Sequence, residues 1–546
     1  MSQLLAHLII VPIVLPLVSA ALLLVLGDKR PRAKSLVNLC ATLLCLVAAI
    51  AILRNANAAP DTAGVYLGSN WDAPFGIVLV ADRLSALMLV LVGVVSFCAA
   101  LYGEAAWARV GVYFHPLFQI QLMGLNGAFL TGDLFNLFVF FEVMLAASYG
   151  LQLHGSGRPR VSAGLHYIAV NLLASSLFLI GLAVLYGVVG TLSMADVAAK
   201  FALVPAGDRG LLHVGTAILA VAFLIKAAIW PLNAWLVPAY AAASAPVAAL
   251  FALMTKVGIY VLIRLWTLFF AEGSPSAHFG APVFLYMGLA TIAVGALGLL
   301  SSLRLGRVAG FSVLVSSGTL LAALGMGVAS VTSAALFYML SATLAVSALF
   351  LLVELVERIG NDGPSELPER DIELDPDTNL DDEEGPLVGR ALPVSTALLG
   401  LTFMVCALLV AGLPPLSGFV AKVSLLTAVL GAGGAAGAFA SAPWWIIGLL
   451  LLSGLSAVIA LSRTGIRHFW ATGRRQAPHM KDVEAASVLM LVFSCVLLTV
   501  FAEPVLRYTS ATAAGLHAPT GYITSVLSKK ARVGPTRALV DAGGSP

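Results

Sequence analysis

Apolar segments of ~20 residues recur along the whole chain, and each is long enough to cross a lipid bilayer as a helix. Only 10% of the 546 residues are charged, whereas soluble domains carry about 25% charged residues. The sequence therefore predicts an all-α polytopic membrane protein and argues against a soluble protein of several domains.

We predict fourteen membrane spans from these segments. They cover residues 4–26, 34–54, 82–103, 112–131, 133–153, 163–190, 211–240, 246–270, 281–303, 307–328, 331–357, 393–430, 443–463 and 484–504. The seventh and twelfth spans are too long for one straight helix, and both contain proline, at Pro231 and at Pro414-Pro415. Proline removes a backbone donor and clashes with the preceding turn, so we expect both helices to be broken. Broken helices often line wet cavities in transporters, although a structural kink would leave the same sequence pattern.

The basic residues of the loops predict the orientation of the chain. With the N-terminus outside, the inner loops hold 17 Lys and Arg residues and the outer loops hold three, at Arg54, Lys200 and Arg209. Cytoplasmic loops are enriched in Lys and Arg, so we predict an outside N-terminus. The first span has no basic residue before it, a basic cluster after it and no small-residue cleavage site, so we expect a retained helix rather than a cleaved signal peptide. The tail from Arg507 onward carries five basic residues on the outer side, which this orientation does not explain.

Two segments lack the pattern of a packed core. Residues 359–390 are acidic and almost free of apolar side chains, which predicts a solvated, mobile inner loop. A metal or partner site in this loop is disfavoured because it has no EF-hand spacing. Residues 515–546 contain turn formers without apolar periodicity, so we expect them to be poorly ordered.

The cysteines give no sign of a redox or metal centre. All five lie in apolar segments, and none forms a CxxC motif or stands at ligand spacing from a histidine. We therefore expect buried structural thiols, with no cofactor and no metal site. We also expect no nucleic-acid partner.

Four charged residues lie deep inside predicted spans: Glu142, Lys226, Lys256 and Lys422. A charge at the centre of a bilayer costs roughly 2.5–3.5 kcal/mol on insertion scales. Four such residues in one chain therefore indicate groups that take up and release protons inside the membrane.

The four charges differ in the partners that the sequence offers. If Glu142 and Lys226 meet, each favours the charged form of the other, and a movement of either changes the proton affinity of its partner. A static ion pair that locks two helices is the alternative, but one glutamate cannot neutralise both Lys226 and Lys256. Lys422 has no acidic residue in its own span. The alternative to a role in proton transfer is that its side chain snorkels to the membrane interface.

Other polar residues near the spans have simpler interpretations. Arg264 and Arg83 lie nearer span ends, where snorkelling or structural pairing is expected, and Asp82 and Arg83 could form a local pair. Asp133 opens the fifth span and is expected to cap its N-terminus. His166 lies a few residues into the sixth span and is the best histidine candidate for a relay member.

Several motifs carry a resemblance to a known family. The stretch TGDLFNLFVFFEVMLAASYGLQ at 131–152 resembles the fifth-helix signature of the antiporter-like subunits of respiratory complex I and of Mrp/Pha cation/proton antiporters. Residues 225–260 and 411–426 resemble the seventh and eighth and the twelfth helices of that family, and DRLSALM at 82–88 resembles the start of the third. The resemblance covers roughly residues 75–465, and the sequences of its motifs are most similar to those of the D-type subunits of the Mrp/Pha group.

The resemblance implies an architecture for the chain. The family fold has fourteen helices, of which helices four to eight and nine to thirteen form two inverted five-helix repeats, with helices seven and twelve broken. The implied domains are helices one to three at 1–110, the first repeat at 111–270, the second repeat at 281–465, and helix fourteen with the tail at 484–546.

The resemblance also implies roles for the buried charges. Glu142 and Lys226 match the paired Glu and Lys of the family, Lys256 matches the bridging Lys or His, and Lys422 matches the terminal Lys. Many relatives carry His and Lys on the eleventh helix, whereas this chain has neither there. Its polar side chains in that span include the candidate relay residues Tyr338, Ser341 and Thr343, and the connection between Lys256 and Lys422 is in question.

The function implied by the resemblance is a proton-translocating subunit of a multisubunit Na⁺ or K⁺/proton antiporter in a bacterial inner membrane. Such a chain is a secondary transporter subunit, not an enzyme, and its partners are other membrane subunits, protons, monovalent cations and the lipid bilayer. One alternative is a proton-pumping subunit of a redox complex, against which the short tail argues. A second is a non-transporting scaffold, against which the complete set of buried charges argues.

Overall fold

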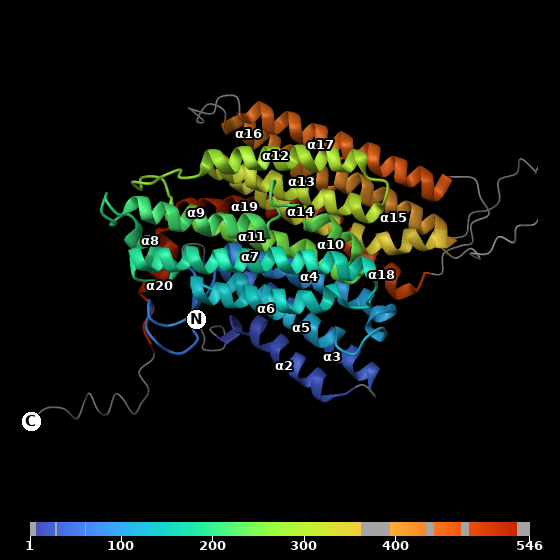
Figure 1. Cartoon of the computed structure of the whole chain (residues 1–546), viewed down its shortest axis with the longest axis horizontal. Coiled ribbons are helices and arrows are strands. Elements are labelled where there is room, and N and C mark those ends of the chain that lie inside the picture. Colours follow the sequence, from blue (N-terminus) through green and yellow to red (C-terminus); the bar gives the residue numbers. More distant parts are fainter. Residues whose placement is uncertain are drawn as a thin grey trace, which may run out of the picture.

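The computed structural model describes residues 7–27, 30–59, 62–361, 394–432, 442–470 and 480–531. The described chain is almost entirely helical, and its long helices lie side by side in one bundle (Figure 1). The first half contains α2 (Val11–Val25), α3 (Pro31–Ala58), α4 (Arg83–Ala105), α5 (Phe114–Leu130), α6 (Leu134–Gln152), α7 (Arg158–Val189), α8 (Met194–Phe201), α9 (Arg209–Lys226), α10 (Leu236–Ala242) and α11 (Ala245–Phe269).

The second half continues the same pattern of long apolar helices. It contains α12 (Ala281–Ser301), α13 (Leu305–Met326), α14 (Ala329–Asn361), α15 (Val394–Ala411), α16 (Ser417–Ala432), α17 (Ala442–Gly465), α18 (Asp482–Val500), α19 (Ala502–His517) and α20 (Thr520–Leu527). The short elements are strands β1 (Gly64–Leu67) and β2 (Val78–Ala81), a 3₁₀ turn at Trp107–Arg109 and a π turn at Ile466–Trp470. The predicted acidic loop at 359–390 lies outside the described residues except for its first three, which end α14.

The bundle confirms the prediction of an all-α polytopic membrane protein. Within the described residues, 12 helices are long and apolar enough to cross a membrane. All fourteen predicted segments contain a helix, but the first and fourth match α2 and α5, which are shorter, with 15 and 17 residues. The count of fourteen spans and the two inverted repeats therefore stay predictions.

Both predicted breaks are present. The seventh segment is divided into α9, which ends at Lys226, and α10, which begins at Leu236. The twelfth is divided into α15, which ends at Ala411, and α16, which begins at Ser417. Each break thus lies within a few residues of one of the predicted lysines, Lys226 at the first and Lys422 at the second.

α11 forms the centre of the bundle. Every residue from Ala245 to Phe269 is buried, and the helix packs against α4, α9, α13 and α14. Helices at the edge expose large apolar side chains instead, such as Val25 on α2 and Leu297 on α12. Extensive exposed apolar surface is what a bilayer, rather than water, accommodates. Lys256 on α11 is therefore shielded from lipid by a complete layer of helices.

Glycines allow some neighbouring helices to approach very closely. A Cβ on Gly288 of α12 would stand 2.5 Å from the backbone nitrogen of Ala322 on α13, and one on Gly325 would stand 2.5 Å from that of Leu285. Small residues at helix crossings are the usual means of packing in membranes, where water does not drive helices together. The α12–α13 pair is therefore a closely packed unit within the second half of the chain.

One end of the bundle carries strands β1 and β2 and the short helices α8 and α20, and we call it the hairpin end. There β1 and β2 pair antiparallel, with Gly64 opposite Ala81, and α8 and α20 lie at the left edge of Figure 1. Val526 of α20 is fully buried and packs against Val78 of β2.

The expectation of a poorly ordered tail is wrong for its first part. Residues up to His517 complete α19, and α20 follows at Thr520–Leu527, while residues 532–546 lie outside the described chain. The buried face of α19 consists of Thr509, Thr512, Ala513 and Leu516. A face of small and polar residues carries little apolar periodicity, so the sequence did not reveal it.

Candidate functional site

Lys226 is the last residue of α9, directly before the first break. Its side chain is buried, with 4% of the residue exposed. Backbone groups released by the break are met by protein: the Trp235 indole donates to the carbonyl of Ile225 at 3.1 Å, and the Trp230 amide donates to Thr291 Oγ1 at 3.0 Å. Freed backbone groups inside a membrane must find such partners. The break is therefore stabilised by hydrogen bonds within the protein, and it places the Lys226 amine at the end of a helix.

Glu142 and Lys226 are brought together, but through a third side chain. The Ser175 hydroxyl on α7 donates a short hydrogen bond to the Glu142 carboxylate, and Lys226 Nζ donates to Ser175 Oγ at 3.4 Å. Lys226 Nζ also lies 5.0 Å from the centre of the Phe141 ring, within cation–π range. The prediction that Glu142 is buried is only partly right, because the residue, in the middle of α6, is only partly buried.

Ser175 was missed by the sequence reasoning. It lies in the middle of the sixth predicted span, beside Ser176, and nothing in the local sequence separates the two hydroxyls. Ser176 is exposed and donates to the carbonyl of Leu172, whereas Ser175 is buried and faces Glu142. Only the packing of α7 against α6 and α9 distinguishes them.

Lys256 lies at the middle of the central helix, with 1% of the residue exposed. Its Nζ donates to Ser316 Oγ at 2.5 Å and lies 3.5 Å from Ser317 Oγ, both on α13. Within the described residues no carboxylate forms an ion pair with it. The structure thus gives Lys256 neutral hydroxyl partners that the sequence reasoning did not identify.

Lys422 follows the second break on α16 and is partly buried. Its Nζ donates to the carbonyl of Ala411, the last residue of α15, at 2.6 Å. Two glycines make room for it: Gly412, whose φ is +76°, and Gly454 on α17. A Cβ at Gly412 would stand 2.5 Å from Lys422 Cδ. The lysine therefore turns back onto the break instead of extending to the interface.

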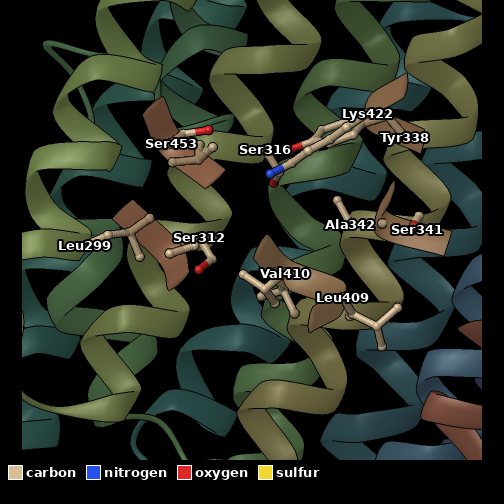
Figure 2. Close-up of a pocket in the computed structure, with 15 residues that line it drawn as sticks. Leu299, Ser312, Ser316, Tyr338, Ser341, Ala342, Leu409, Val410, Lys422 and Ser453 are labelled. Carbon is tan, nitrogen blue, oxygen red and sulfur yellow. The ribbon is translucent and has the colours of Figure 1, made fainter. Parts of the chain in front are cut away.

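The candidate relay residues divide into two groups. Tyr338 and Ser341 on α14 are buried and face the same internal cavity as Lys422 (Figure 2). Thr343 is buried but donates to the carbonyl of Met339 at 2.6 Å and does not line that cavity. His166 is exposed on the outer surface of α7, so the structure does not bring it to the buried charges.

The polar residues near the span ends behave partly as expected. Asp133 caps α6 by accepting from the Asn136 amide at 2.8 Å, as predicted. The predicted local pair of Asp82 with Arg83 is wrong. Asp82 instead makes a two-bond ion pair with Arg264 of α11, with both nitrogen–oxygen distances at 2.6 Å.

Two further observations concern ligands. The five cysteines are free thiols, and Cys40 is exposed rather than buried. The described residues contain no group of three or more His, Cys, Asp and Glu side chains able to hold a metal ion. The side chains gathered at Glu142, Lys226, Lys256 and Lys422 are carboxylate, amine and hydroxyl groups, which can bind protons.

A family profile, curated relatives and solved structures show which proteins the chain is similar to. The profile of the NADH:quinone oxidoreductase/Mrp antiporter transmembrane family matches residues 131–448. That range begins just before α6, includes both breaks and contains all four predicted charged residues.

Two curated relatives align over nearly the full chain. One is a probable K⁺/H⁺ antiporter D-type subunit from Rhizobium meliloti, which is 50% identical over 534 residues, covering 97% of this chain and 99% of the relative. The other is the D-type subunit of a Na⁺/H⁺ antiporter from Alkalihalophilus pseudofirmus, which is 31% identical over 533 residues, covering 96% and 100% of the two chains.

A solved structure also matches the fold. A chain of the Mrp complex from Dietzia sp. DQ12-45-1b superposes with a TM-score of 0.82 at 28% identity, covering 96% of this chain and 100% of that one. The similarity therefore extends over the entire bundle and is not confined to the segment around the buried lysines.

Proposed function

The chain belongs to the NADH:quinone oxidoreductase/Mrp antiporter transmembrane family, and we propose that it is the proton-translocating D-type subunit of a multisubunit monovalent cation/proton antiporter. The observation that carries the proposal is the 50% identity over 534 residues with a protein named as the D-type subunit of a K⁺/H⁺ antiporter. The 31% identical relative is named for Na⁺. K⁺ is accordingly the first cation to test, with Na⁺ as the comparison.

In this proposal the buried charges carry the proton in sequence. Glu142 modulates Lys226 through the shared hydroxyl of Ser175, because a negative charge nearby stabilises the ammonium form. Lys256 receives the proton at the centre of the bundle, and Lys422 connects it to one side of the membrane. No bond other than those to protons is made or broken, so the chain acts as a secondary transporter subunit, not as an enzyme.

The setting of the subunit follows from the same reasoning. We place it in a bacterial inner membrane with its N-terminus outside, because this puts 17 basic loop residues on the inner side. Its partners are other membrane subunits of the antiporter, and the complex as a whole exchanges the cation. The two repeats, at 111–270 and 281–465, each contribute one broken helix with a lysine at the break.

The test is cation/proton exchange in inverted vesicles that contain the complete complex. We expect Lys226→Ala and Glu142→Gln to abolish exchange while the complex still assembles, as judged by co-purification of the subunits. Lys200→Ala serves as the control, because the Lys200 side chain is 44% exposed and pairs with Asp196 one turn away on α8. Normal exchange in either of the first two variants would refute the proposed function.

The same vesicles distinguish the redox alternative. A subunit of a redox-driven pump moves protons only when an electron donor is supplied, whereas an antiporter subunit responds to a cation gradient alone. Proton movement on addition of K⁺ or Na⁺ without a donor supports the antiporter, and movement that requires NADH supports the pump.

A further inference from the structure

A recess opens at the end of the bundle opposite the hairpin end, at the point where α3 begins. Helix α4 starts directly after β2 at the hairpin end and reaches this recess with its last turn. The recess has an empty volume of about 1350 Å³, and its polar lining consists of Arg32, Lys34, Ser35, Glu104 and His115. The proposed proton path uses residues of α6, α9, α11 and α16, so these polar side chains need a different explanation.

The start of α3 presents positive charge to the recess. Within the described residues, no side chain caps its first turn, which begins at Pro31. The N-terminus of a helix carries a partial positive charge and uncapped amides, and it readily binds anions. Arg32 is exposed, Lys34 is only 6% exposed, and both line the recess. A phosphate group is therefore the kind of ligand that this side of the recess favours.

The opposite side of the recess offers groups for hydroxyl partners. The Glu104 carboxylate accepts a short hydrogen bond from the Ser35 hydroxyl, and a carboxylate can accept several such bonds. His115 is 4% exposed, and within the described residues its Nδ1 has no hydrogen-bond partner. Glu104 Oε1 lies 3.7 Å from that nitrogen, which is too far for a hydrogen bond. Buried polar atoms are nearly always hydrogen-bonded, so this nitrogen indicates a ligand or water in the recess.

An apolar face of α3 continues directly from the recess. The helix lies at the edge of the bundle, where it packs against α2 and α4 (Figure 1). It exposes large apolar side chains at Leu36, Leu43, Val47 and Ile50. Their spacing places them on one side of the helix, and Leu36 follows Ser35 of the recess. A lipid with its headgroup in the recess would lay an acyl chain along this face, whereas a free phosphate ion would make no use of it.

From this geometry we propose that the recess binds an anionic phospholipid whose headgroup carries hydroxyl groups, as phosphatidylglycerol does. The phosphate lies against Arg32, Lys34 and the first amides of α3, and the headgroup hydroxyls face Glu104 and His115. Basic pockets between membrane helices on the cytoplasmic side are typical binding sites for such headgroups. The assignment of the lipid to the inner leaflet rests on the orientation in the proposed function, whereas the site itself does not.

The test uses the purified, delipidated antiporter complex and phosphatidylglycerol with a photoactivatable group in its acyl chain, so that the headgroup is unaltered. We expect saturable labelling of residues 36–50, located by mass spectrometry of the peptides. Unlabelled phosphatidylglycerol should compete. Phosphatidylcholine should not, because its headgroup has no net charge and no hydroxyl. Inorganic phosphate should compete only at much higher concentration, because it has no acyl chain to bury on α3.

Two pairs of variants link the labelling to the recess. Arg32→Gln should weaken the apparent affinity by about fivefold, the usual contribution of one basic residue near anionic lipid. Arg158→Gln is its control, because Arg158 is also an exposed arginine beside a proline at the start of a long helix but does not line the recess. Val110 is 55% exposed and lines the recess. Val110→Glu should weaken labelling by about fivefold or more, whereas Val110→Gln, of equal size, should change it little.

Four results would overturn the proposal. Unchanged labelling in both Arg32→Gln and Val110→Glu would show that the recess does not hold the headgroup. Equal competition by phosphatidylcholine would mean unspecific lipid around α3, and equal competition by inorganic phosphate would mean a site for a free anion. No labelling of residues 36–50 in the assembled complex would mean that a partner subunit covers the recess. The readout is lipid labelling and not exchange, so each of these results leaves the proposed function standing.

Discussion

Gly454 of α17 lies directly against the Lys422 ammonium group, so close that a Cβ on the glycine would stand 3.2 Å from Nζ. The same Cβ would stand 3.1 Å from the carbonyl of Ala411, which is the acceptor of the lysine. Contacts of this length require the neighbours to move. The absence of a side chain at Gly454 therefore sets the position of Lys422 and of its hydrogen bond.

Gly454→Ala is accordingly expected to impair exchange while the subunit remains assembled. Displacement of a reacting group by about 1 Å can cost about 10²-fold in rate, so a loss of about tenfold or more is expected. Gly448→Ala is the control on the same helix, because a Cβ there meets no atom within 4 Å. Exchange rates in vesicles compare the two variants, and equal rates would show that Gly454 does not position the lysine.

Ser175→Ala should weaken the coupling of Glu142 with Lys226 without removing either charge. Hydrogen bonds to charged groups contribute about 1.5–3 kcal/mol, so we expect exchange to fall by about tenfold or more. Some activity should remain, in contrast to Lys226→Ala. Ser176→Ala is the control, because its hydroxyl is exposed and bonds only within its own helix. Wild-type exchange in Ser175→Ala would exclude a bridging role.

The sequence predicts the architecture much better than it predicts the partners of the buried charges. Hydropathy locates the helices because a bilayer requires long apolar segments, and proline locates the two breaks because it cannot continue the backbone ladder. The capping role of Asp133 was also predictable, since the residue and the amide that it accepts from are three positions apart.

The hydroxyl partners could not be predicted for a physical reason. Ser175 and Ser316 belong to helices different from those of the charges they contact, so their roles depend on the rotation and packing of helices. A serine inside an apolar helix commonly donates its hydroxyl proton to a backbone carbonyl of the same helix, as Ser176 does here. Local sequence therefore does not distinguish a serine that contacts a lysine from one that contacts nothing else.

The Asp82–Arg264 pair is expected to hold the hairpin end of the bundle together. The Arg264 side chain is 6% exposed and the Asp82 side chain 19% exposed, so removal of one charge leaves the other buried without compensation. Breaking such a pair costs about 3–5 kcal/mol. Asp82→Asn retains a side chain able to cap α4 and should lower the thermal midpoint of the purified complex markedly.

Two comparison variants make this prediction specific. Asp82→Asn/Arg264→Leu should be more stable than Asp82→Asn alone, because the unpaired guanidinium is removed. Arg83→Ala should have little effect, since Arg83 makes only a 3.5 Å hydrogen bond to Asn57 and a distant ring contact with Tyr508. A double variant that is less stable than Asp82→Asn would contradict this explanation.

The contribution of His517 to the stability of α19 packing is expected to depend on pH. Burial lowers the pKa of the His517 imidazole below its ordinary value of about 6.5, although the nearby Glu272 opposes the shift. The folded chain therefore binds fewer protons at this site than the unfolded chain, so its contribution is fully present above about pH 6.5 and is lost as the pH falls. The hydrogen bond between His517 Nε2 and Thr332 Oγ1, 3.0 Å long, joins α19 to the start of α14.

The measurement is the thermal midpoint of the wild-type complex and of His517→Gln from about pH 8 to about pH 5. Other groups titrate in both proteins, so the informative quantity is the difference between their midpoints at each pH. We expect this difference to favour the wild type most at high pH and to shrink as the pH falls, because only the wild type carries a partly buried imidazole whose protonation favours the unfolded chain. A difference that stays constant over the whole range would mean that His517 titrates equally in the folded and unfolded chains.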